Sequence, residues 1–272
     1  MIDLHNHLLP GIDDGAKRLE ETLQFLRMAR QDGVSTVVAT PHMKPGVYDN
    51  TRETILQRVA MVKEAQKGDE AEGVELLPGA EVYFTADLPE RARSGTLMTV
   101  GDRGRYILLE LPYQQIPLGV DDMIFRLRLA GLTPIMAHPE RVAYYLEDLE
   151  RLAASVRIGA LTQVTASSIT GRFGEKAQSY ARDMLQRNLI HVLASDSHDV
   201  RYRPPLLTEA VRAVAGIVGE ASALRMVRET PAAILEGRDV EIPEVRPAPR
   251  PGIMGRLRSF LSRTSPGRRE SP

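Results

Sequence analysis

Short apolar stretches alternate with longer amphipathic stretches through the first 240 residues of the chain. The short stretches have strand length and many β-branched residues, whereas the longer ones place apolar residues three or four positions apart, as helices do. The stretches that predict strands are residues 2–4, 35–40, 74–77, 106–111, 133–137, 161–165 and 191–194. The stretches that predict helices are residues 16–31, 51–67, 121–130, 145–156, 175–188, 206–218 and 221–229, with one more short helix opening at Thr230-Pro231. This alternation predicts a parallel α/β architecture.

The pattern changes after Pro243, where proline recurs and few residues are apolar. Such a stretch cannot continue a helix and has little to bury, so we expect one folded domain over residues 1–240 and a flexible Pro/Arg-rich tail over residues 241–272. Within the tail, residues 253–263 have the spacing of a short basic amphipathic helix. Docking of this segment on a membrane surface or a partner is one interpretation, and a solvated disordered tail is the other.

The composition limits the classes of function. A chain of 272 residues, 43% of them hydrophobic, is long enough for one large α/β domain. Its formal net charge of −1 argues against a nucleic-acid binder, which normally carries a basic excess. The sequence contains no cysteine, so disulfides, thiolate metal ligands and a cysteine nucleophile are excluded. Any hydrolysis must therefore use another nucleophile, such as metal-bound water.

No stretch of the sequence is long and apolar enough to span a bilayer, and the first predicted strand begins directly after Met1. We therefore expect no signal segment and a cytoplasmic protein. Docking of the C-terminal tail would recruit that protein to the inner face of the membrane.

Five of the six histidines follow a predicted strand, namely His5, His7, His42, His138 and His198. In a barrel of alternating strands and helices, residues at the carboxyl ends of the strands meet on one face. Imidazoles gathered there with carboxylates are typical of a metal site, so the histidine positions favour a barrel over an open sheet. The sixth histidine, His191, lies at the start of its predicted strand without a carboxylate nearby in the sequence, and we predict a structural role for it.

The first two histidines lie in a motif that also supplies carboxylates. His5 and His7 are one residue apart, so an extended strand end points both side chains to the same side, as the capture of one ion requires. Asp13-Asp14-Gly15 follows as a tight turn. An aspartate of this turn could reach the same ion, or Asp14 could cap the helix that is predicted to follow.

Further carboxylates complete the set of candidate ligands. Glu81 follows the third predicted strand, and we expect Gly79 to let the backbone approach a bound ion there. Glu110 lies in an otherwise apolar strand, where burial costs several kcal/mol unless the carboxylate binds a metal or joins a buried salt bridge. Asp196 lies two residues before His198, which repeats the spacing of the first histidine pair.

The number and type of these ligands indicate two or three ions, since they are too many for one. Nitrogen and oxygen ligands without sulfur suit manganese, iron or zinc. Clustered divalent ions generate hydroxide from a bridging water and hold the oxygens of a phosphoryl group. Arg141 and Arg203 follow ligand motifs closely and are our candidates for binding phosphate, with a surface arginine as the alternative for each. Asp3 and Asn6 are candidates for orienting the ligands.

Taken together, these motifs resemble a known family. Met-Ile-Asp-Leu-His-Asn-His with Asp-Asp-Gly, Thr-Pro-His, Gly-Ala-Glu-Val-Tyr, Ala-His-Pro-Glu-Arg and Ser-Asp-Ser-His occur in this order between residue 1 and about residue 237. They are similar to motifs of the polymerase and histidinol phosphatase (PHP) superfamily. Within it, they look most like the bacterial tyrosine-protein phosphatases of the CpsB/CapC type, which are encoded with capsule and exopolysaccharide genes. The tail after residue 243 departs from the compact pattern of that family.

The resemblance implies a distorted, TIM-like (β/α)7 barrel of the PHP type with a trinuclear, usually manganese-dependent site. The ligand sets that it implies for the three ions are, in turn, His5, His7, Glu81 and Asp196; Glu81, Glu110 and His138; and Asp14, His42 and His198. Many members of the superfamily have histidine where this chain has Asp14, and Asp13 lies adjacent, so the choice between the two aspartates stays open. Arg141 and Arg203 would bind the phosphate.

The implied activity is hydrolysis of protein phosphotyrosine by a metal-bridging hydroxide, without a covalent phosphoenzyme. In that family the substrate lies in the tail of a membrane-associated tyrosine autokinase that regulates polysaccharide export. We predict that turnover depends on His42, Asp196, Arg141 and Arg203. The alternatives are a phosphatase for small molecules such as histidinol phosphate, an enzyme acting on nucleic-acid ends, and a weakly active module that docks on a kinase or a membrane.

Overall fold

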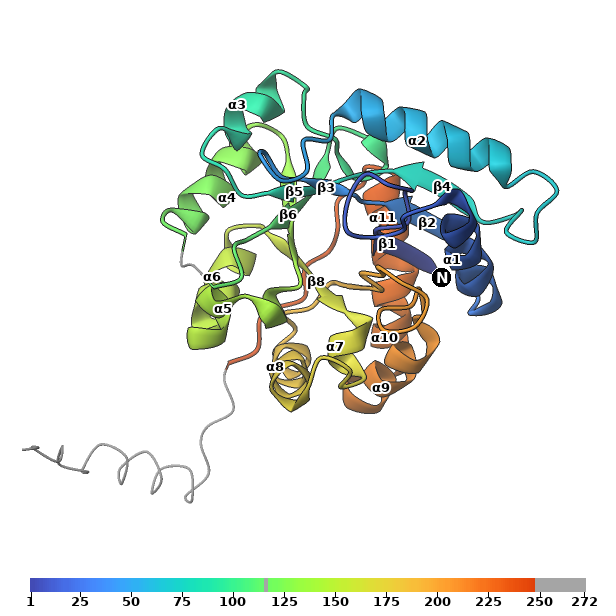
Figure 1. The fold of residues 1–272 in the computed structure, drawn as a ribbon. Helices are drawn as coiled ribbons and strands as arrows, with labels where there is room; N and C mark the ends of the chain where they lie inside the picture. Colours follow the sequence, from blue (N-terminus) through green and yellow to red (C-terminus); the bar gives the residue numbers. More distant parts are fainter. Residues whose placement is uncertain (115–116, 248–272) are drawn as a thin grey trace, which may run out of the picture.

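A computed structural model describes residues 1–114 and 117–247 of the chain (Figure 1). The strands in these residues are β1 (Ile2–Asn6), β2 (Thr36–Ala39), β3 (His42–Met43), β4 (Glu75–Pro78), β5 (Glu81–Tyr83), β6 (Tyr106–Glu110), β7 (Thr133–Ala137), β8 (Leu161–Thr165) and β9 (Val192–Ala194). The α-helices are α1 (Leu19–Gln31), α2 (Arg52–Ala65), α3 (Leu88–Arg93), α4 (Val120–Leu129), α5 (Ala143–Glu147), α6 (Leu149–Arg157), α7 (Ala166–Ile169), α8 (Glu175–Gln186), α9 (Thr208–Val218), α10 (Glu220–Val227) and α11 (Glu229–Leu235).

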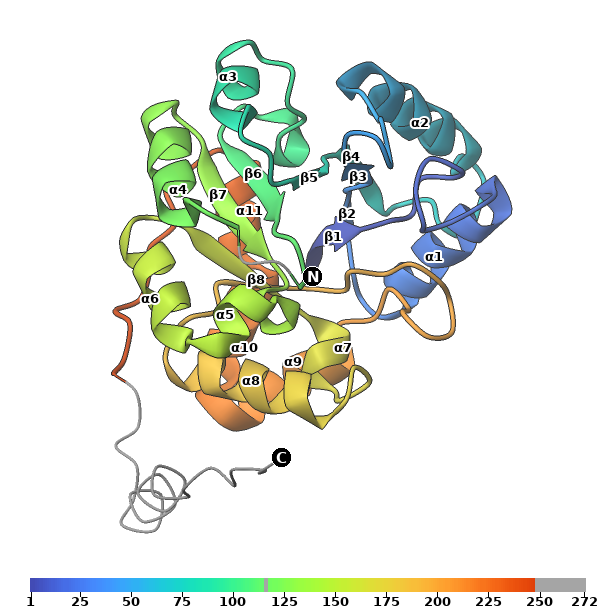
Figure 2. The same cartoon turned by 60° about the vertical axis from the view of Figure 1, so that its left-hand side comes forward.

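The strands form two sheets by hydrogen bonding. One has the order β1-β2-β4 and the other the order β3-β5-β6-β7-β8-β9, and neighbouring strands are parallel throughout. An isolated parallel bridge between Asn6 and Ser197 connects β1 with the chain that follows β9. Helices lie around the strands in two views of the molecule (Figure 1, Figure 2). The predicted parallel α/β architecture is confirmed.

Two segments of the chain each contribute a strand to both sheets. β2 is separated from β3 by residues 40–41, and β4 is separated from β5 by residues 79–80. The sequence does not predict β3 and β5, which are two and three residues long. A Cβ atom on Gly79 would lie 2.7 Å from Cγ1 of Val38, so glycine permits the close packing of the two segments. The packing against β2 is a reason for glycine at this position, and its expected part in the approach to an ion stays a prediction.

The alternation of side chains along β6 brings a glutamate to the end of an apolar surface. The buried apolar side chains form two clusters. Ile107 and Leu109 face the larger cluster, which we call the larger core, whereas Tyr106 and Leu108 face a second cluster to which both sheets contribute residues. Because strand residues alternate, Glu110 continues the face of Tyr106 and Leu108 at the carboxyl end of β6. The second cluster consists of Leu4, Val38, Val100, Tyr106, Leu108, Ile135, Ala137, Leu161, Val192, Ala194 and Ile234.

The sequence does not predict the short helices α3 and α7, and the predicted helices differ from the observed ones at their beginnings and breaks. α1 begins at Leu19 rather than at residue 16, and its N-cap is Arg18. The interpretation of Asp14 as an N-cap is therefore wrong. The helix predicted over residues 145–156 is two helices, α5 and α6, which meet at Asp148. The side chain of Asp148 accepts the N–H of Glu150 and so begins α6.

The last described residues pack against the body of the domain without forming a helix or a strand. Ile242 and Val245 contact the larger core. Nδ2 of Asn188 donates to the carbonyl of Glu244, and Nε of Arg187 donates to the carbonyl of Arg246. The amphipathic helix predicted over residues 253–263 lies outside the described residues. Among the helices of the described part, none has the length and apolar character needed to cross a membrane.

Candidate metal centre

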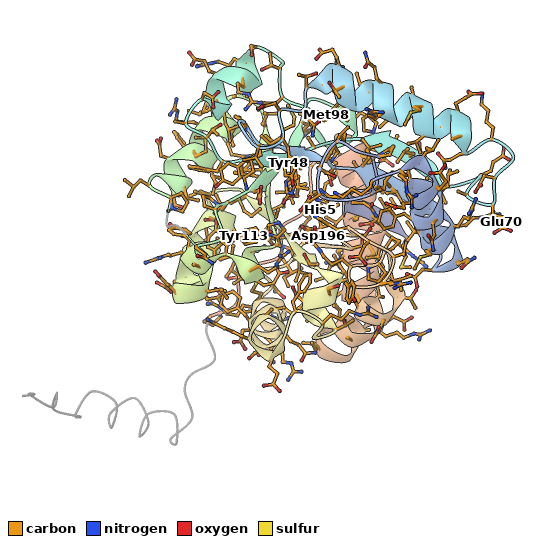
Figure 3. The ribbon with its side chains drawn as sticks, in the orientation of Figure 1. His5, Tyr48, Glu70, Met98, Tyr113 and Asp196 are labelled. Carbon is orange, nitrogen blue, oxygen red and sulfur yellow. The ribbon has the colours of Figure 1, made fainter. Side chains whose placement is uncertain are left out.

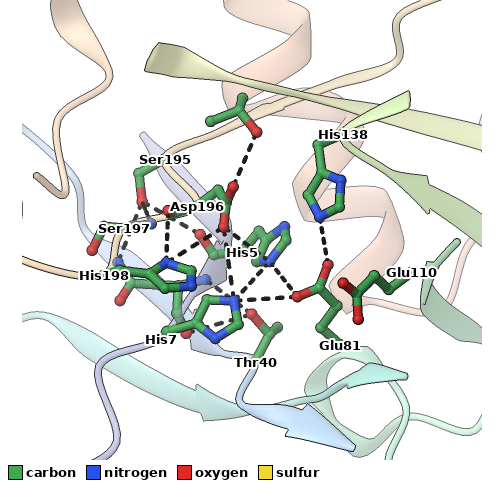
Figure 4. A network of polar contacts seen from close by, with 12 residues as sticks. His5, His7, Thr40, Glu81, Glu110, His138, Ser195, Asp196, Ser197 and His198 are labelled. Atoms are coloured by element: carbon green, nitrogen blue, oxygen red, sulfur yellow. Dashed lines mark hydrogen bonds and ion pairs between the residues drawn. The ribbon is translucent and has the colours of Figure 1, made fainter. Parts of the chain in front are cut away.

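Two fully buried imidazoles lie at the end of β1. Nε2 of His5 and Nε2 of His7 are 3.0 Å apart, as expected for side chains that point to the same side. Nδ1 of His5 lies 2.9 Å from Oε1 of Gln163, and Nδ1 of His7 lies 2.8 Å from Oδ2 of Asp13. These contacts fix both rings so that each Nε2 faces the carboxylate of Glu81 (Figure 4).

Glu81, the first residue of β5, lies among four imidazoles. Its Oε2 is 3.3 Å from Nε2 of His5, 3.3 Å from Nε2 of His7 and 3.1 Å from Nδ1 of His42. Its Oε1 is 2.7 Å from Nε2 of His138. Burial alone would raise the pKa of Glu81, but the charges of His5 and His138 hold that pKa well below its usual range. Both oxygens of this carboxylate would therefore be available to hold a cation.

Asp196 follows β9 and faces two kinds of partner. Its Oδ1 lies 3.5 Å from Nε2 of His5 and 3.6 Å from Nδ1 of His198. Its Oδ2 lies 3.0 Å from a terminal nitrogen of Arg141 and 2.7 Å from one of Arg203. His5 and Asp196 lie near the middle of the ribbon, whereas Glu70 marks its edge (Figure 3). Asp196 therefore joins the histidine cluster to the pair of arginines.

The two aspartates of the turn after β1 have different surroundings. Oδ1 of Asp14 lies 3.5 Å from Nε2 of His42 and 3.4 Å from Nε2 of His198, and its side chain is 46% exposed. Asp13 is buried instead, where Oδ2 contacts His7 and accepts the N–H of His42 at 3.2 Å. Asp14 therefore lies in the group that could hold an ion, and Asp13 orients a neighbouring imidazole.

Gly15 completes this turn by a close backbone approach. A Cβ atom at this position would lie 1.8 Å from the carbonyl oxygen of His7, which no side chain could tolerate. The N–H of Gly15 donates to Oδ1 of Asp13 at 2.9 Å. The glycine of the Asp-Asp-Gly motif thus lets the turn fold back over the end of β1.

Glu110 is a buried carboxyl beside another carboxyl. Burial and the charge of Glu81 raise the pKa of Glu110 to about 8. Oε2 of Glu110 lies 3.5 Å from Nδ1 of His42 and 3.9 Å from Nζ of Lys44. Neither distance is short enough for a good hydrogen bond. A buried salt bridge, which is the alternative to metal binding for Glu110, is therefore weak.

Three groups of side chains in the described residues have the spacing of metal ligands. In each group, one ligand atom per residue lies within 4.8 Å of all the others. The groups are His5, His7 and Glu81; His42, Glu81 and Glu110; and His7, Asp14, His42 and His198. They overlap with the three implied sets but place His42, rather than His138, with Glu81 and Glu110. His138 lies beside Glu81 and 3.3 Å from the hydroxyl of Tyr113.

The residues of these groups fit the binding of cations. Nδ1 of His42 and Oε2 of Glu110 are buried without a hydrogen-bond partner among the described residues. Unpaired buried groups of this kind are unfavourable, and two adjacent carboxylates are more so. A divalent cation between them would satisfy the unpaired atoms and neutralise the repulsion of the carboxylates. These nitrogen and oxygen atoms are therefore more favourably placed with a bound metal than without one.

The two arginines lie against aromatic rings. Cζ of Arg141 is 4.6 Å from the ring centroid of Phe173 and 5.0 Å from that of Tyr113. Cζ of Arg203 is 5.7 Å from the centroid of Phe173. The ring of Tyr113 in turn stacks on His138, with centroids 5.2 Å apart. Both arginine side chains are about three-quarters buried, with exposures of 24% and 21%, so neither is a surface arginine.

Two residues of the site have left-handed backbone conformations. His138 has φ 32°, and Asp196 has φ 50°. Residues other than glycine rarely adopt such conformations, which cost about 1–3 kcal/mol and cluster at functional sites. His138 directly follows β7 and Asp196 lies two residues after β9, so both conformations occur where a strand has ended.

Sequence reasoning does not identify several residues that support the cluster. Gln163 contacts His5, and buried Glu140 accepts the N–H of Thr165 at 3.0 Å and the hydroxyl of Ser168 at 2.7 Å. Gln163 lies between Thr162 and Val164 in a strand that also contains Thr165, so its polar character does not mark it in the sequence. Tyr113 and Phe173 lie in loops, where no periodic pattern marks them.

Asp3 and Asn6 support the cluster through the backbone rather than through the ligand rings. Oδ1 of Asp3 accepts the N–H of Ser195 at 2.9 Å, and Oδ2 accepts the hydroxyl of Ser195 at 2.6 Å and Nδ2 of Asn6 at 3.2 Å. These bonds tie the end of β1 to the end of β9. They therefore fix the relative positions of the histidine pair and Asp196.

His191 lies apart from the cluster, before β9. The backbone N–H of Thr162 donates to its Nδ1 at 3.0 Å, and burial lowers its pKa to about 4. The ring is therefore neutral, and none of the three ligand groups in the described residues contains it. This environment agrees with the predicted structural role.

A family model for capsular polysaccharide synthesis proteins of the CpsB/CapC type matches residues 1–236. The chain belongs to the CpsB/CapC family. The putative tyrosine-protein phosphatase CapC of Staphylococcus aureus is 33% identical over 209 residues, which cover 77% of this chain and 81% of that protein. The tyrosine-protein phosphatase CpsB of Streptococcus pneumoniae is 32% identical over 244 residues, which cover 86% and 98% of the two chains. The resemblance inferred from the sequence motifs is confirmed.

Solved structures agree with this membership of the CpsB/CapC family. A chain from the crystal structures of YwqE of Bacillus subtilis and CpsB of S. pneumoniae, described as metal-dependent tyrosine phosphatases, superimposes with a TM-score of 0.86. It is 29% identical, and the match covers 92% of this chain and 100% of that one. A phosphotriesterase homology protein from Escherichia coli, with a TM-score of 0.53 and 13% identity over 85% of this chain and 97% of that one, shares the fold alone.

Proposed function

We propose that this CpsB/CapC family member is a metal-dependent phosphatase that hydrolyses phosphotyrosine in proteins. One observation carries the proposal: a buried cluster of histidines and carboxylates meets two arginines through a single aspartate, Asp196. Cations and guanidinium groups placed side by side are what a phosphate monoester requires. The names of the relatives, all tyrosine-protein phosphatases, support phosphotyrosine as the substrate class.

The metal ligands of the proposal are the nine residues predicted from the sequence, namely His5, His7, Asp14, His42, Glu81, Glu110, His138, Asp196 and His198. Their nitrogen and oxygen atoms suit two or three manganese ions, with iron, zinc or cobalt as alternatives. Bound divalent ions lower the pKa of a coordinated water and so supply a nucleophile near neutral pH. Arg141 and Arg203 bind the phosphoryl oxygens and stabilise the charge that develops on them.

The two sheets, in this proposal, are parts of one distorted seven-stranded barrel of the PHP type. β2 with β3 and β4 with β5 then count as single interrupted strands, and the bridge between Asn6 and Ser197 joins the first strand to the last. The cluster lies at the carboxyl ends of these strands, where barrel enzymes place their active sites.

The phosphoprotein substrate is, in this proposal, a membrane-associated tyrosine kinase of the polysaccharide export system. A cytoplasmic location, with recruitment to the inner face of the membrane, follows from that substrate. No described feature favours a nucleic-acid substrate, and the net charge of −1 disfavours one.

Phosphate release from a phosphotyrosine peptide and from histidinol phosphate, with manganese-loaded protein and a chelator-treated control, tests the proposal. We expect a chelator-sensitive preference for the peptide. Preference for histidinol phosphate would retain the metal centre but reject the substrate class. Hydrolysis that survives complete removal of metal would reject the mechanism.

A further inference from the structure

Phe173 contacts both arginine side chains of the site, and the proposed function assigns it no role. Its ring centroid lies 4.6 Å from Cζ of Arg141 and 5.7 Å from Cζ of Arg203. Both distances are within the range of cation–π attraction, in which the negative face of the ring attracts a guanidinium group. One aromatic ring thus contacts two cations that lie in different loops, after β7 and after β9.

A pair of guanidinium groups needs such contacts because like charges repel. Oδ2 of Asp196 attracts both, at 3.0 Å from Arg141 and 2.7 Å from Arg203, and it occupies an N–H donor of Arg141. Phe173 attracts the same two groups through its ring and accepts no conventional hydrogen bond. The remaining N–H donors are therefore free to bind a phosphoryl group.

Arg141 is also held on a second side. Its Cζ lies 5.0 Å from the ring centroid of Tyr113, which stacks on His138 at an angle of 16°. Burial raises the pKa of Tyr113, so the phenol stays neutral. The position of Arg141 is thereby linked to a candidate metal ligand, whereas Arg203 has Phe173 as its aromatic partner among the described residues.

We propose that Phe173 is a positioning residue that holds Arg141 and Arg203 together as a two-armed receptor for a phosphoryl group. This inference rests on the proposed function only in taking a phosphoryl group as the ligand of the arginines. Phe173 acts through the two guanidinium groups and does not touch the reacting atoms. Its loss lets the arginines separate, so that binding of phosphate weakens while the metal ligands stay in place.

The test is the affinity of manganese-loaded protein for inorganic phosphate, measured by titration calorimetry. We expect Phe173→Leu, which keeps an apolar side chain without the π face, to weaken binding about tenfold. Phe173→Tyr restores the aromatic face and should bind within about twofold of the unchanged protein. Phe125→Leu on the exposed side of α4 is the matched control and should leave the affinity unchanged. Manganese content and melting temperature, measured for every variant, show whether the fold and the metal are retained.

A double-mutant cycle separates positioning from general packing. In the Arg141→Ala/Arg203→Ala background, adding Phe173→Leu should change the phosphate affinity no further, since the groups through which Phe173 acts are absent. An undiminished effect of Phe173→Leu in that background, or normal affinity of Phe173→Leu alone, would overturn the inference. If Phe173→Leu does not fold, Phe173→Tyr and Phe173→Met decide the same question. Phosphate binding without phosphotyrosine hydrolysis would reject the proposed function and leave this inference standing.

Discussion

Buried histidines occur at both ends of the strands, and their surroundings differ. At the carboxyl ends, burial alone would lower the pKa of His7, but the charges of Asp13 and Glu81 raise it well above its usual value. At the start of β9, burial lowers the pKa of His191 to about 4 with no carboxylate to oppose it. Burial is therefore common to both histidines, and carboxylates distinguish the candidate metal centre from a structural imidazole.

The first prediction concerns a ligand that contacts both histidines and arginines. Asp196→Asn keeps the shape of the side chain but removes its charge. Because loss of a residue that merely supports a ligand costs about 10–100-fold, loss of this ligand should lower kcat/KM by more than about a hundredfold. Phosphate release from a phosphotyrosine peptide measures the effect.

The control for this prediction is His191→Asn at the opposite end of β9. We expect activity within about twofold of the unchanged protein, because the site keeps all of its ligands. Equal losses of activity in Asp196→Asn and His191→Asn would contradict the distinction between a metal centre at the carboxyl ends of the strands and a structural histidine at the start of β9.

The second prediction concerns Asp13, which contacts a candidate ligand without belonging to a ligand group. Asp13→Asn should weaken manganese binding about 10–100-fold, because Nδ1 of His7 loses its charged partner. Titration calorimetry with manganese measures this loss. Asp69→Asn, a change in a carboxylate paired with Arg27 away from the site, is the control and should bind manganese normally.

The third prediction concerns protons that compete with metal. Glu110, with its pKa raised to about 8, is mostly protonated at pH 6.5 and must release its proton to bind a cation. The affinity for manganese should therefore fall as the pH falls, by roughly tenfold or more between pH 8.5 and pH 6.5. Glu110→Gln should weaken binding and flatten this dependence. An affinity that is independent of pH in the unchanged protein would contradict the assignment of Glu110 as a ligand.

The last prediction concerns the stability contributed by His191, away from the site. With a folded pKa near 4 and an ordinary value of 6.5, the unfolded state binds more protons between these pH values. The contribution of His191 to the free energy of unfolding is therefore present above pH 6.5 and is lost as the pH falls toward 4. Between pH 7 and pH 5 the unchanged protein should lose about 2 kcal/mol more than His191→Asn. Urea unfolding of both proteins at the two pH values measures the difference, and parallel pH dependences would contradict it.

The sequence predicts most strands because their apolar runs have few rival interpretations. Residues 133–137 and 161–165 coincide with β7 and β8. β3 and β5 escape prediction because they are too short for a pattern, and the gaps that contain Pro41 and Gly79 separate them from β2 and β4. The helix predicted over residues 145–156 divides at Asp148, where a local side-chain cap overrides the apolar periodicity.

The sequence predicts more of the candidate site than of the fold around it. Histidines and carboxylates at strand ends are visible in the sequence, and contacts between side chains bring all nine predicted ligands into one cluster. The choice of Asp14 over Asp13 could not be predicted, because it depends on how the turn folds back over His7. Phe173 and Tyr113 could not be predicted either, since their contacts depend on the meeting of distant loops.

Elemental analysis of the full chain after dialysis, alongside Asp196→Asn, counts the manganese ions on which the proposed metal centre depends. We expect two or three ions per chain in the unchanged protein and fewer in the variant. An unchanged protein that retains no divalent metal, or a variant that retains as much as the unchanged protein, would contradict this expectation.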